Sequence, residues 1–250
     1  MDVLYVGDDK LQSTHFLAGA ESVQLFNRRL ADFEPLLGAL EAEAGLAVEH
    51  LPAHETVDRF PATADELAAY DALIVSDLSL DTLLPHFRPE EIPGPNRPQL
   101  IADYVREGGG LVYCGGWMSF QGYHGIGNWA ESPVAELLPV ETRNVFDDRV
   151  ERPEGVAIDR VERGHRITEG LDWAAFPAMY GYNRVGGVRA DAKRLASVDG
   201  DPLLAVREAG DGRALAYTSD PGPKWGLELV EWEDYGTFWR RALEWVTGEQ

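Results

Sequence analysis

Cysteine and lysine are both scarce in this 250-residue sequence, and long apolar runs are absent. The single cysteine, Cys114, excludes an internal disulfide and fits a reducing compartment, so we expect a cytoplasmic location. No uninterrupted apolar run approaches the roughly 18 residues of a membrane-spanning helix, which argues against a membrane protein. Residues 1–9 begin directly with a strand pattern and lack the basic start of a secretion signal.

Positive charge is also scarce, because 43 acidic residues face only 22 basic ones and the net charge is −21. Lys10, Lys193 and Lys224 are the only lysines, so nearly all the cations are arginines. Such a surface resembles salt-accumulating halophilic proteins, in which a Debye length of about 3 Å at 1 M screens self-repulsion. An ordinary acidic protein with cationic partners is the alternative. Both interpretations exclude nucleic acid as a favoured partner, since its phosphates would be repelled.

Apolar runs and helical patterns alternate along the first half of the chain. Hydrophobic residues make up 44% of the sequence and aromatic residues 10%, which is enough to form a sizeable core. Continuous apolar runs are typical of buried parallel strands, whereas apolar residues at helical spacing predict helices. The predicted strands are residues 2–7, 46–51, 72–77 and 111–114, and the predicted helices are residues 33–44, 64–70 and 99–107.

This alternation predicts an α/β fold with a mostly parallel, doubly wound sheet that carries helices on both faces. The Gly210-Asp211-Gly212 turn lies between two strand-like runs, which predicts a β-hairpin near the end of the chain. An amphipathic pattern then predicts a final helix. These C-terminal strands are residues 194–198, 203–208 and 213–219, and the helix is residues 235–246.

Three stretches lack these patterns and are predicted to be loops. They are the residues between the first strand and position 33, the proline-rich segment 85–98, and residues 141–190, where periodicity weakens. We interpret the last stretch as loops with a short excursion rather than as a second domain. The sequence shows no internal repeat, so we expect a single domain over residues 1–250.

Three carboxylates follow predicted strands directly. Asp8, Asp77 and Asp220 come at or just after the ends of three strands, and Gly116 follows a fourth. Ligands of open parallel sheets bind beyond the carboxyl ends of the strands, so these residues are candidates for binding a small polar molecule. A cation, a sugar or an amine would suit such a group. The alternative is that each aspartate caps a following helix.

Cys114 ends a predicted strand before Gly115-Gly116, an arrangement similar to a nucleophile elbow. Such an elbow needs small residues on both sides, but Val112 and Tyr113 precede the thiol. A cysteine within the strand would point into the core and stay inert. No histidine follows position 165, so the His-x-Glu pair expected late in a glutaminase is missing. We therefore interpret Cys114 as structural, with catalysis by Cys114 and His124 as the alternative.

Residues 117–129 are rich in glycine and aromatic side chains. Glycines let a backbone approach a ligand closely, and polar and aromatic side chains here could bind it. The alternative is a loop packed under its own aromatics. The glycine spacing does not match a phosphate-binding motif, and the histidines are too scattered for a metal site, so we expect no cofactor and no metal. The candidate ligand-binding residues are Trp117, Ser119, Tyr123, His124 and Trp129.

Several of these motifs together resemble a family of glutamine amidotransferase-like proteins. The matching stretches are 108–112, 115–122, 212–220 and Trp225-Gly226, with Ser76-Asp77, while 165–171 is similar to the related trehalose-utilisation proteins. The resemblance spans about residues 1–247. It implies a flavodoxin-like three-layer core of the class I glutamine amidotransferase-like type. It also implies an aliphatic residue at the position of Cys114, and a histidine where this chain has Lys224, which we place at the ligand site.

Three functions compete on this evidence. The first is a glutamine amidotransferase-like protein without glutaminase activity that binds a small polar ligand at the carboxyl edge of the sheet. The second is an amidotransferase or hydrolase with Cys114 as its nucleophile. The third is a self-assembling structural protein, a homo-oligomer whose tryptophan-rich surface packs against copies of itself. We favour the first because the cysteine lies in an unsuitable setting.

Overall fold

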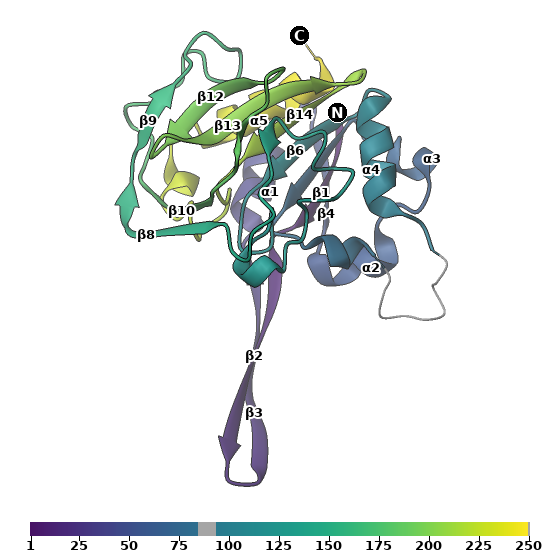
Figure 1. Cartoon of the computed structure of the whole chain (residues 1–250), viewed down its shortest axis with the longest axis vertical. Helices are drawn as coiled ribbons and strands as arrows, with labels where there is room; N and C mark the ends of the chain where they lie inside the picture. Colours follow the sequence, from purple (N-terminus) through teal and green to yellow (C-terminus); the bar gives the residue numbers. More distant parts are fainter. Residues whose placement is uncertain (85–93, 250) are drawn as a thin grey trace.

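The central feature is an eight-stranded, mostly parallel sheet with the order β4-β1-β5-β6-β14-β13-β12-β9 (Figure 1). The computed structural model describes residues 1–84 and 94–249, with residues 23–27 described by their backbone alone; most of the predicted 85–98 loop lies outside them. The neighbours β4, β1, β5, β6 and β14 run parallel to one another. Strands β13, β12 and β9 follow, and each pairs antiparallel with the strand before it in this order. The bounds are β1 (Asp2–Gly7), β4 (Ala47–Leu51), β5 (Ala72–Ser76), β6 (Gly110–Cys114), β9 (Ile158–Val161), β12 (Lys193–Val198), β13 (Asp201–Ala209) and β14 (Gly212–Tyr217).

Helices cover both faces of this sheet, because alternate residues of each buried strand point to opposite sides. In β1, Val3 and Tyr5 pack with one core cluster, whereas Leu4 and Val6 pack with the other. The first cluster includes α1 and α5, and the second includes α3 and α4. The predicted three-layer, doubly wound core, C-terminal hairpin and final helix are thus confirmed. The helices are α1 (Glu34–Glu41), α2 (Thr56–Arg59), α3 (Ala64–Leu67), α4 (Arg97–Arg106), α5 (Tyr235–Thr247), and the short η1 (Ala53–Glu55), η2 (Leu80–Leu83), η4 (Tyr123–Gly125) and η5 (Leu229–Glu231).

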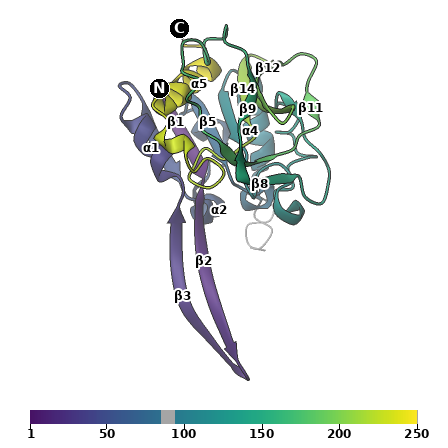
Figure 2. The ribbon, with the colours of Figure 1, turned by 90° about the vertical axis from the view of Figure 1, so that its left-hand side faces the viewer.

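A long antiparallel hairpin leaves the body directly after β1. It consists of β2 (Asp9–Ala18) and β3 (Glu21–Ala31), and it extends well beyond the body on the side opposite the two chain ends (Figures 1 and 2). We call residues 9–31 the arm. The prediction of a loop here is wrong. Residues 11–18 of the arm are all exposed, so no buried face imposes an apolar alternation on them, and the two strands pair their backbone groups with each other.

Residues 141–190 contain more strand than the predicted loops with a short excursion. Two small antiparallel ribbons form, β8 with β10 and β7 with β11. Much of β8 is exposed, so it lacks the apolar pattern by which strands are recognised. None of the described helices combines the length and apolar character needed to cross a bilayer. The bounds are β7 (Val140–Glu141), β8 (Arg149–Val156), β10 (Met179–Asn183) and β11 (Gly187–Val188).

Candidate functional site

Asp8, Asp77 and Asp220 meet at the carboxyl edge of the sheet. One carboxylate oxygen of each lies within 4.8 Å of the others, and the three residues are between 0% and 2% exposed. The strand order is that of flavodoxin-like folds, whose ligand site lies where the order reverses, between β1 and β5 here. Asp8 follows β1 and Asp77 follows β5. We call these three aspartates the acidic cluster; their predicted convergence is what the structure shows.

The backbone around the acidic cluster is held in an unusual conformation. Asp8 and Asp77 have φ values of 51° and 43°, in the left-handed region that residues with a side chain rarely adopt. The hydroxyl of Ser119 accepts a hydrogen bond from the Asp77 amide at 3.0 Å, and the Met118 amide donates to Asp77 Oδ1 at 2.6 Å. The loop after β6 therefore fixes the turn after β5. Strain of this kind is found most often at functional sites.

Two of the three lysines of the chain cover the acidic cluster. Lys224 Nζ lies 3.0 Å from Asp77 Oδ2 and 3.2 Å from Asp32 Oδ2. Lys10 Nζ forms ion pairs with the same two carboxylates. A lysine ammonium is a compact charge that can sit between two carboxylates, whereas the planar guanidinium of arginine is broader. The placement of Lys224 agrees with the prediction; Lys10 and Asp32 were missed, although the scarcity of lysine already marked Lys10 as unusual.

Negative charge exceeds positive charge at this site. Among the described residues, four carboxylates, including Asp32, face two ammonium groups, so full ionisation of these six groups leaves a net charge of −2. Burial, and then the neighbouring Asp77, raise the pKa of Asp8 to about 6. Burial, and then Asp8 and Asp77, raise the pKa of Asp220 well above its ordinary value.

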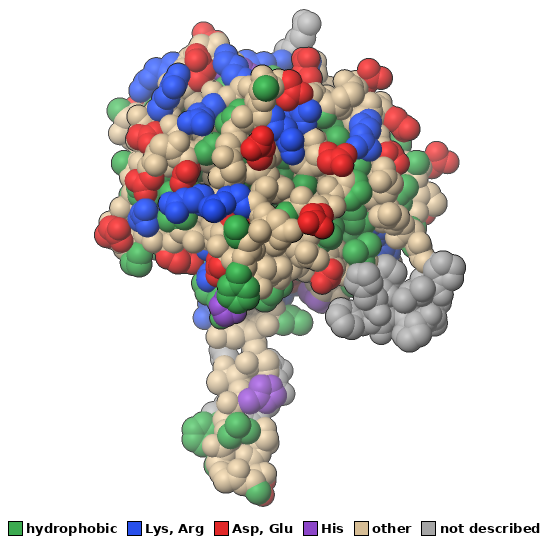
Figure 3. All heavy atoms as spheres, viewed as in Figure 1, with side chains coloured by type: hydrophobic (Ala, Val, Ile, Leu, Met, Phe, Trp, Pro, Cys, Tyr) green, Lys and Arg blue, Asp and Glu red, His purple; other side chains and the backbone are tan. Residues whose placement is uncertain are grey.

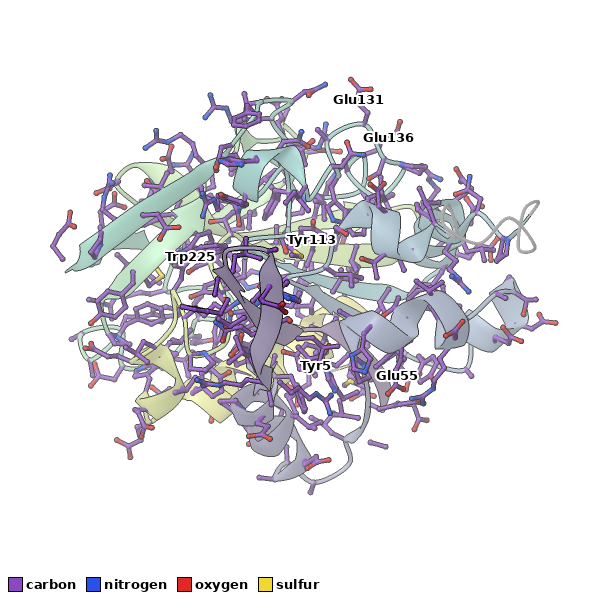
Figure 4. All side chains as sticks on the ribbon, turned by 90° about the horizontal axis from the view of Figure 1, so that it is seen from below. Tyr5, Glu55, Tyr113, Glu131, Glu136 and Trp225 are labelled. Carbon is purple, nitrogen blue, oxygen red and sulfur yellow. The ribbon has the colours of Figure 1, made fainter. Side chains whose placement is uncertain are left out.

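One carboxylate oxygen of the acidic cluster lacks a partner. Asp8 Oδ2 accepts a 2.5 Å hydrogen bond from the Tyr5 hydroxyl, and the buried Ser76 hydroxyl also interacts with the Asp8 carboxylate. Asp220 Oδ1 accepts a hydrogen bond from the Gly222 amide at 2.8 Å, whereas Asp220 Oδ2 is buried without a partner among the described residues. Buried polar atoms are nearly always satisfied, so Asp220 Oδ2 marks a place where a donor from outside can bind. Figure 4 looks along the arm into this end of the molecule and labels Tyr5.

A glycine and a buried asparagine shape the opposite wall. Gly116 has a φ of 151°, and a Cβ atom added there would lie 2.7 Å from Asp77 Cγ, so only glycine fits. Its amide donates to Asn183 Oδ1 at 2.8 Å. Asn183 Nδ2 in turn donates to Asp148, which also accepts the amides of Gln121 and Gly122 at 2.9 Å. Residues 148 and 183, from the stretch predicted as loops, thus anchor the loop after β6.

Cys114 lies inside the protein. Cys114 is 0% exposed, and its side chain belongs to the core layer between the sheet and the helices α1 and α5. Burial raises the pKa of the thiol well above its ordinary value, and the carboxylates of Asp8 and Asp220 raise it further. The prediction of a buried cysteine within the strand agrees with this position.

His124 and its aromatic neighbours form a separate surface stack. The His124 ring packs between Tyr123 at 3.8 Å and Phe146 at 4.8 Å, and Tyr123 stacks on Trp117 at 5.5 Å between ring centres. The Arg149 guanidinium covers both Trp117 and Tyr123. Among the described residues, none of these rings forms a hydrogen bond with the acidic cluster. The contacts of the Trp117, Tyr123 and His124 rings are thus with one another, with Phe146 and with Arg149.

Trp129 does not offer a ring face at the surface. It is 0% exposed, its ring nitrogen donates to the Leu78 carbonyl at 2.8 Å, and its ring packs edge-on against Tyr113. The expectation that Trp129 is available to a ligand or to another copy of the chain is wrong. Glycines in residues 117–129 let the chain fold back over this ring, which the sequence pattern alone did not reveal.

A cavity of about 470 Å³ opens beside the acidic cluster. Lys10 and Met118 line the cavity and also contact the acidic cluster, since Lys10 pairs with Asp77 and the Met118 amide donates to it. This volume suits a small-molecule ligand. Its walls combine apolar and polar side chains, namely Asp9, Lys10, Leu11, Ala53, His54, Val57, Ser79, Asp81, Thr82, Leu84 and Met118.

Comparison with known proteins gives one family and two close structures. A family model described as "Putative glutamine amidotransferase" matches residues 2–248. The chain is similar to cytoplasmic protein STM3548 of Salmonella typhimurium, with 30% identity, a TM-score of 0.91, and coverage of 98% of this chain and 99% of the other. It is also similar to cytoplasmic protein STM1381 of Salmonella typhimurium LT2, with 35% identity, a TM-score of 0.88 and the same coverage.

More distant structures share the fold alone. A ThuA-like protein from Bacteroides uniformis has 14% identity and a TM-score of 0.52, over 98% of this chain and 90% of the other. No curated protein matches this sequence.

Proposed function

The chain belongs to the glutamine amidotransferase-like family whose model it matches, and we propose that it lacks glutaminase activity and binds a small polar ligand at the acidic cluster. The burial of Cys114 carries the first part of this proposal. A glutaminase of this fold needs an accessible thiolate and an adjacent general base. Here the thiol is enclosed, its pKa is raised, and its nearest charged groups are carboxylates.

We predict that the Cys114 thiol does not react in the folded protein. Iodoacetamide is expected to leave the native chain unlabelled for hours at pH 8 and to label it at one position after unfolding in urea, because only the thiolate reacts and burial suppresses it. Mass spectrometry measures the label. Incubation with glutamine should release no ammonia. Rapid native labelling, or ammonia release that is lost in Cys114→Ser, would instead support the cysteine-dependent enzyme.

The charge and shape of the site indicate the ligand class. The acidic cluster and Asp32 exceed their lysine partners by two negative charges, and the buried oxygen Asp220 Oδ2 has no hydrogen-bond donor among the described residues. A positively charged group can satisfy both, whereas an anion would be repelled. The adjoining cavity has room for a carbon skeleton, and Leu11, Val57 and Leu84 give it apolar surface beside its polar side chains. We therefore infer a small amine, with its ammonium group at the acidic cluster and its body in the cavity.

Calorimetric titration with putrescine, a small diamine, tests the site. Asp220→Asn is expected to weaken binding by about tenfold or more, because a hydrogen bond to a charged group is worth about 1.5–3 kcal/mol. Asp9→Asn is the comparison variant at the cavity wall, where the Asp9 carboxylate is already engaged by the Ala53 amide at 2.7 Å and by Arg29 at 3.1 Å. It should change affinity less than Asp220→Asn does. Equal effects of the two variants would contradict this location.

Calcium chloride is the comparison ligand, because it carries the same charge as putrescine without a carbon skeleton. Binding of calcium in preference to putrescine would contradict the amine and indicate a metal site formed by the three carboxylates. Binding of neither would contradict a cationic ligand.

We further propose that the chain forms one domain and is located in the cytoplasm; the names of the two Salmonella proteins support the cytoplasmic location.

A further inference from the structure

The described side chains of the arm are exposed over residues 11–22 and 28–29. After its first two residues, every residue of β2 is exposed, and Leu11, Phe16 and Leu17 are 67%, 57% and 74% exposed. A two-stranded ribbon that packs against nothing is marginally stable in water. Figure 3 shows hydrophobic side chains on the part of the arm farthest from the body. The arm therefore has the properties of a surface that another molecule covers.

The arm also lacks most of the features that keep strand edges from associating. Monomeric proteins protect exposed edges with lysine, proline, β-bulges or short strands, and of these the arm has only a register shift between Thr14 and His15. Residues 11–28 contain neither lysine nor proline, although the whole chain has 15 prolines, and each strand of the arm has at least ten residues. Both edges thus present unprotected backbone groups.

Charge distinguishes the arm from the body. Residues 11–28 contain one acidic residue, Glu21, and one basic residue, Arg28, so they carry no net charge, whereas the whole chain carries −21. Two acidic bodies repel each other over the screening distance. A neutral, apolar-bearing arm is the part that can contact another copy without this repulsion, while its length keeps the bodies apart.

We propose that copies of this chain associate through their arms, with residues 11–28 as the contact surface. Identical copies supply identical edges, so a two-fold association can pair one edge of an arm with the same edge of its neighbour. The proposed contact also reaches the acidic cluster. Asp9 and Lys10 are the first residues of β2, and Lys10 pairs with Asp77, so an arm held by a neighbouring copy fixes one of the two cations of the site.

Sedimentation velocity over a range of protein concentrations tests the proposal. The wild-type chain is expected to have at least twice the mass of one chain. The double variant Phe16→Glu/Leu17→Glu should raise the dissociation constant of the oligomer about tenfold or more, because it places like charges at the contact. Leu227→Glu, at a side chain 54% exposed on the body, is the control and should leave the mass unchanged.

Salt and truncation provide two further readouts. Association should strengthen between 0.1 and 1 M NaCl, since screening removes repulsion between the bodies, whereas an interface of attractive ion pairs would weaken.

Replacing residues 13–27 with Asn-Gly should yield a monomeric protein with the circular dichroism of a folded body. A wild-type chain that is monomeric throughout, or a shortened chain that keeps the oligomeric mass, would overturn the proposal.

Discussion

Asp8→Asn and Asp220→Asn are each expected to stabilise the ligand-free protein at pH 8. Burial makes ionisation of either carboxyl unfavourable in the folded state, as their raised pKa values show. Asparagine has nearly the same shape without the charge, and its oxygen can still accept the hydrogen bond from Tyr5 or from Gly222. For Asp8, the difference between 3.8 and about 6 corresponds to at most about 3 kcal/mol.

The pH dependence of this gain gives the sharper test. The unfolded chain loses the Asp8 proton near pH 3.8, but the folded chain holds it until about pH 6. The free energy of unfolding of the wild type therefore falls as pH rises through this window. Asp8→Asn should match the wild type below pH 4 and gain its full advantage above pH 6. Thermal melts from pH 4 to 8 measure it, at roughly 2–4 °C for each kcal/mol.

An exposed aspartate provides the control for these melts. Asp65→Asn, on the surface of α3, should shift the melting temperature little at any pH. A loss of stability in Asp8→Asn at pH 8 would contradict the assigned electrostatics. A gain in stability joined to weaker putrescine binding would show that the acidic cluster sacrifices stability for binding, as functional sites commonly do.

Trp129→Ala should lower the free energy of unfolding by about 3–5 kcal/mol. The ring is 0% exposed, it packs against Tyr113, and its nitrogen donates to the Leu78 carbonyl. Truncation therefore leaves both a cavity and an unpaired carbonyl. Urea denaturation followed by circular dichroism measures the change.

Trp117→Ala is the matched comparison, since Trp117 is 42% exposed and stacks only at the surface. Its cost should be about 1 kcal/mol or less, as for other surface changes. Similar losses in the two variants would mean that Trp129 is not the buried anchor of the loop after β6.

The parallel core could be predicted because its strands are buried on both faces. A short, continuous apolar run such as Ala72–Ser76 is typical of a strand in the middle of a parallel sheet. The pairing of β14 with β6 could not be predicted, because nothing local specifies a partner about a hundred residues away. The arm was missed for the opposite reason, since its residues bury no face and carry no pattern.

Some residues at the acidic cluster could likewise be predicted from the sequence, and others could not. Asp8, Asp77 and Asp220 could be placed together because all parallel strands end at one edge of the sheet. Lys10 and Asp32 could not be placed, because they stand at the two ends of a hairpin whose sequence predicts a loop. Their role depends on that hairpin returning the chain to its starting point.

The position of β14 in the sheet also constrains how the protein is made. Residues 1–114 can form β1, β4, β5 and β6 as they leave the ribosome. The second edge of β6 stays unpaired until residues 212–217 have been synthesised and form β14. Nearly the whole chain must therefore be synthesised before the central sheet closes. During that interval the nascent chain exposes an apolar strand edge, which is the kind of surface that chaperones recognise.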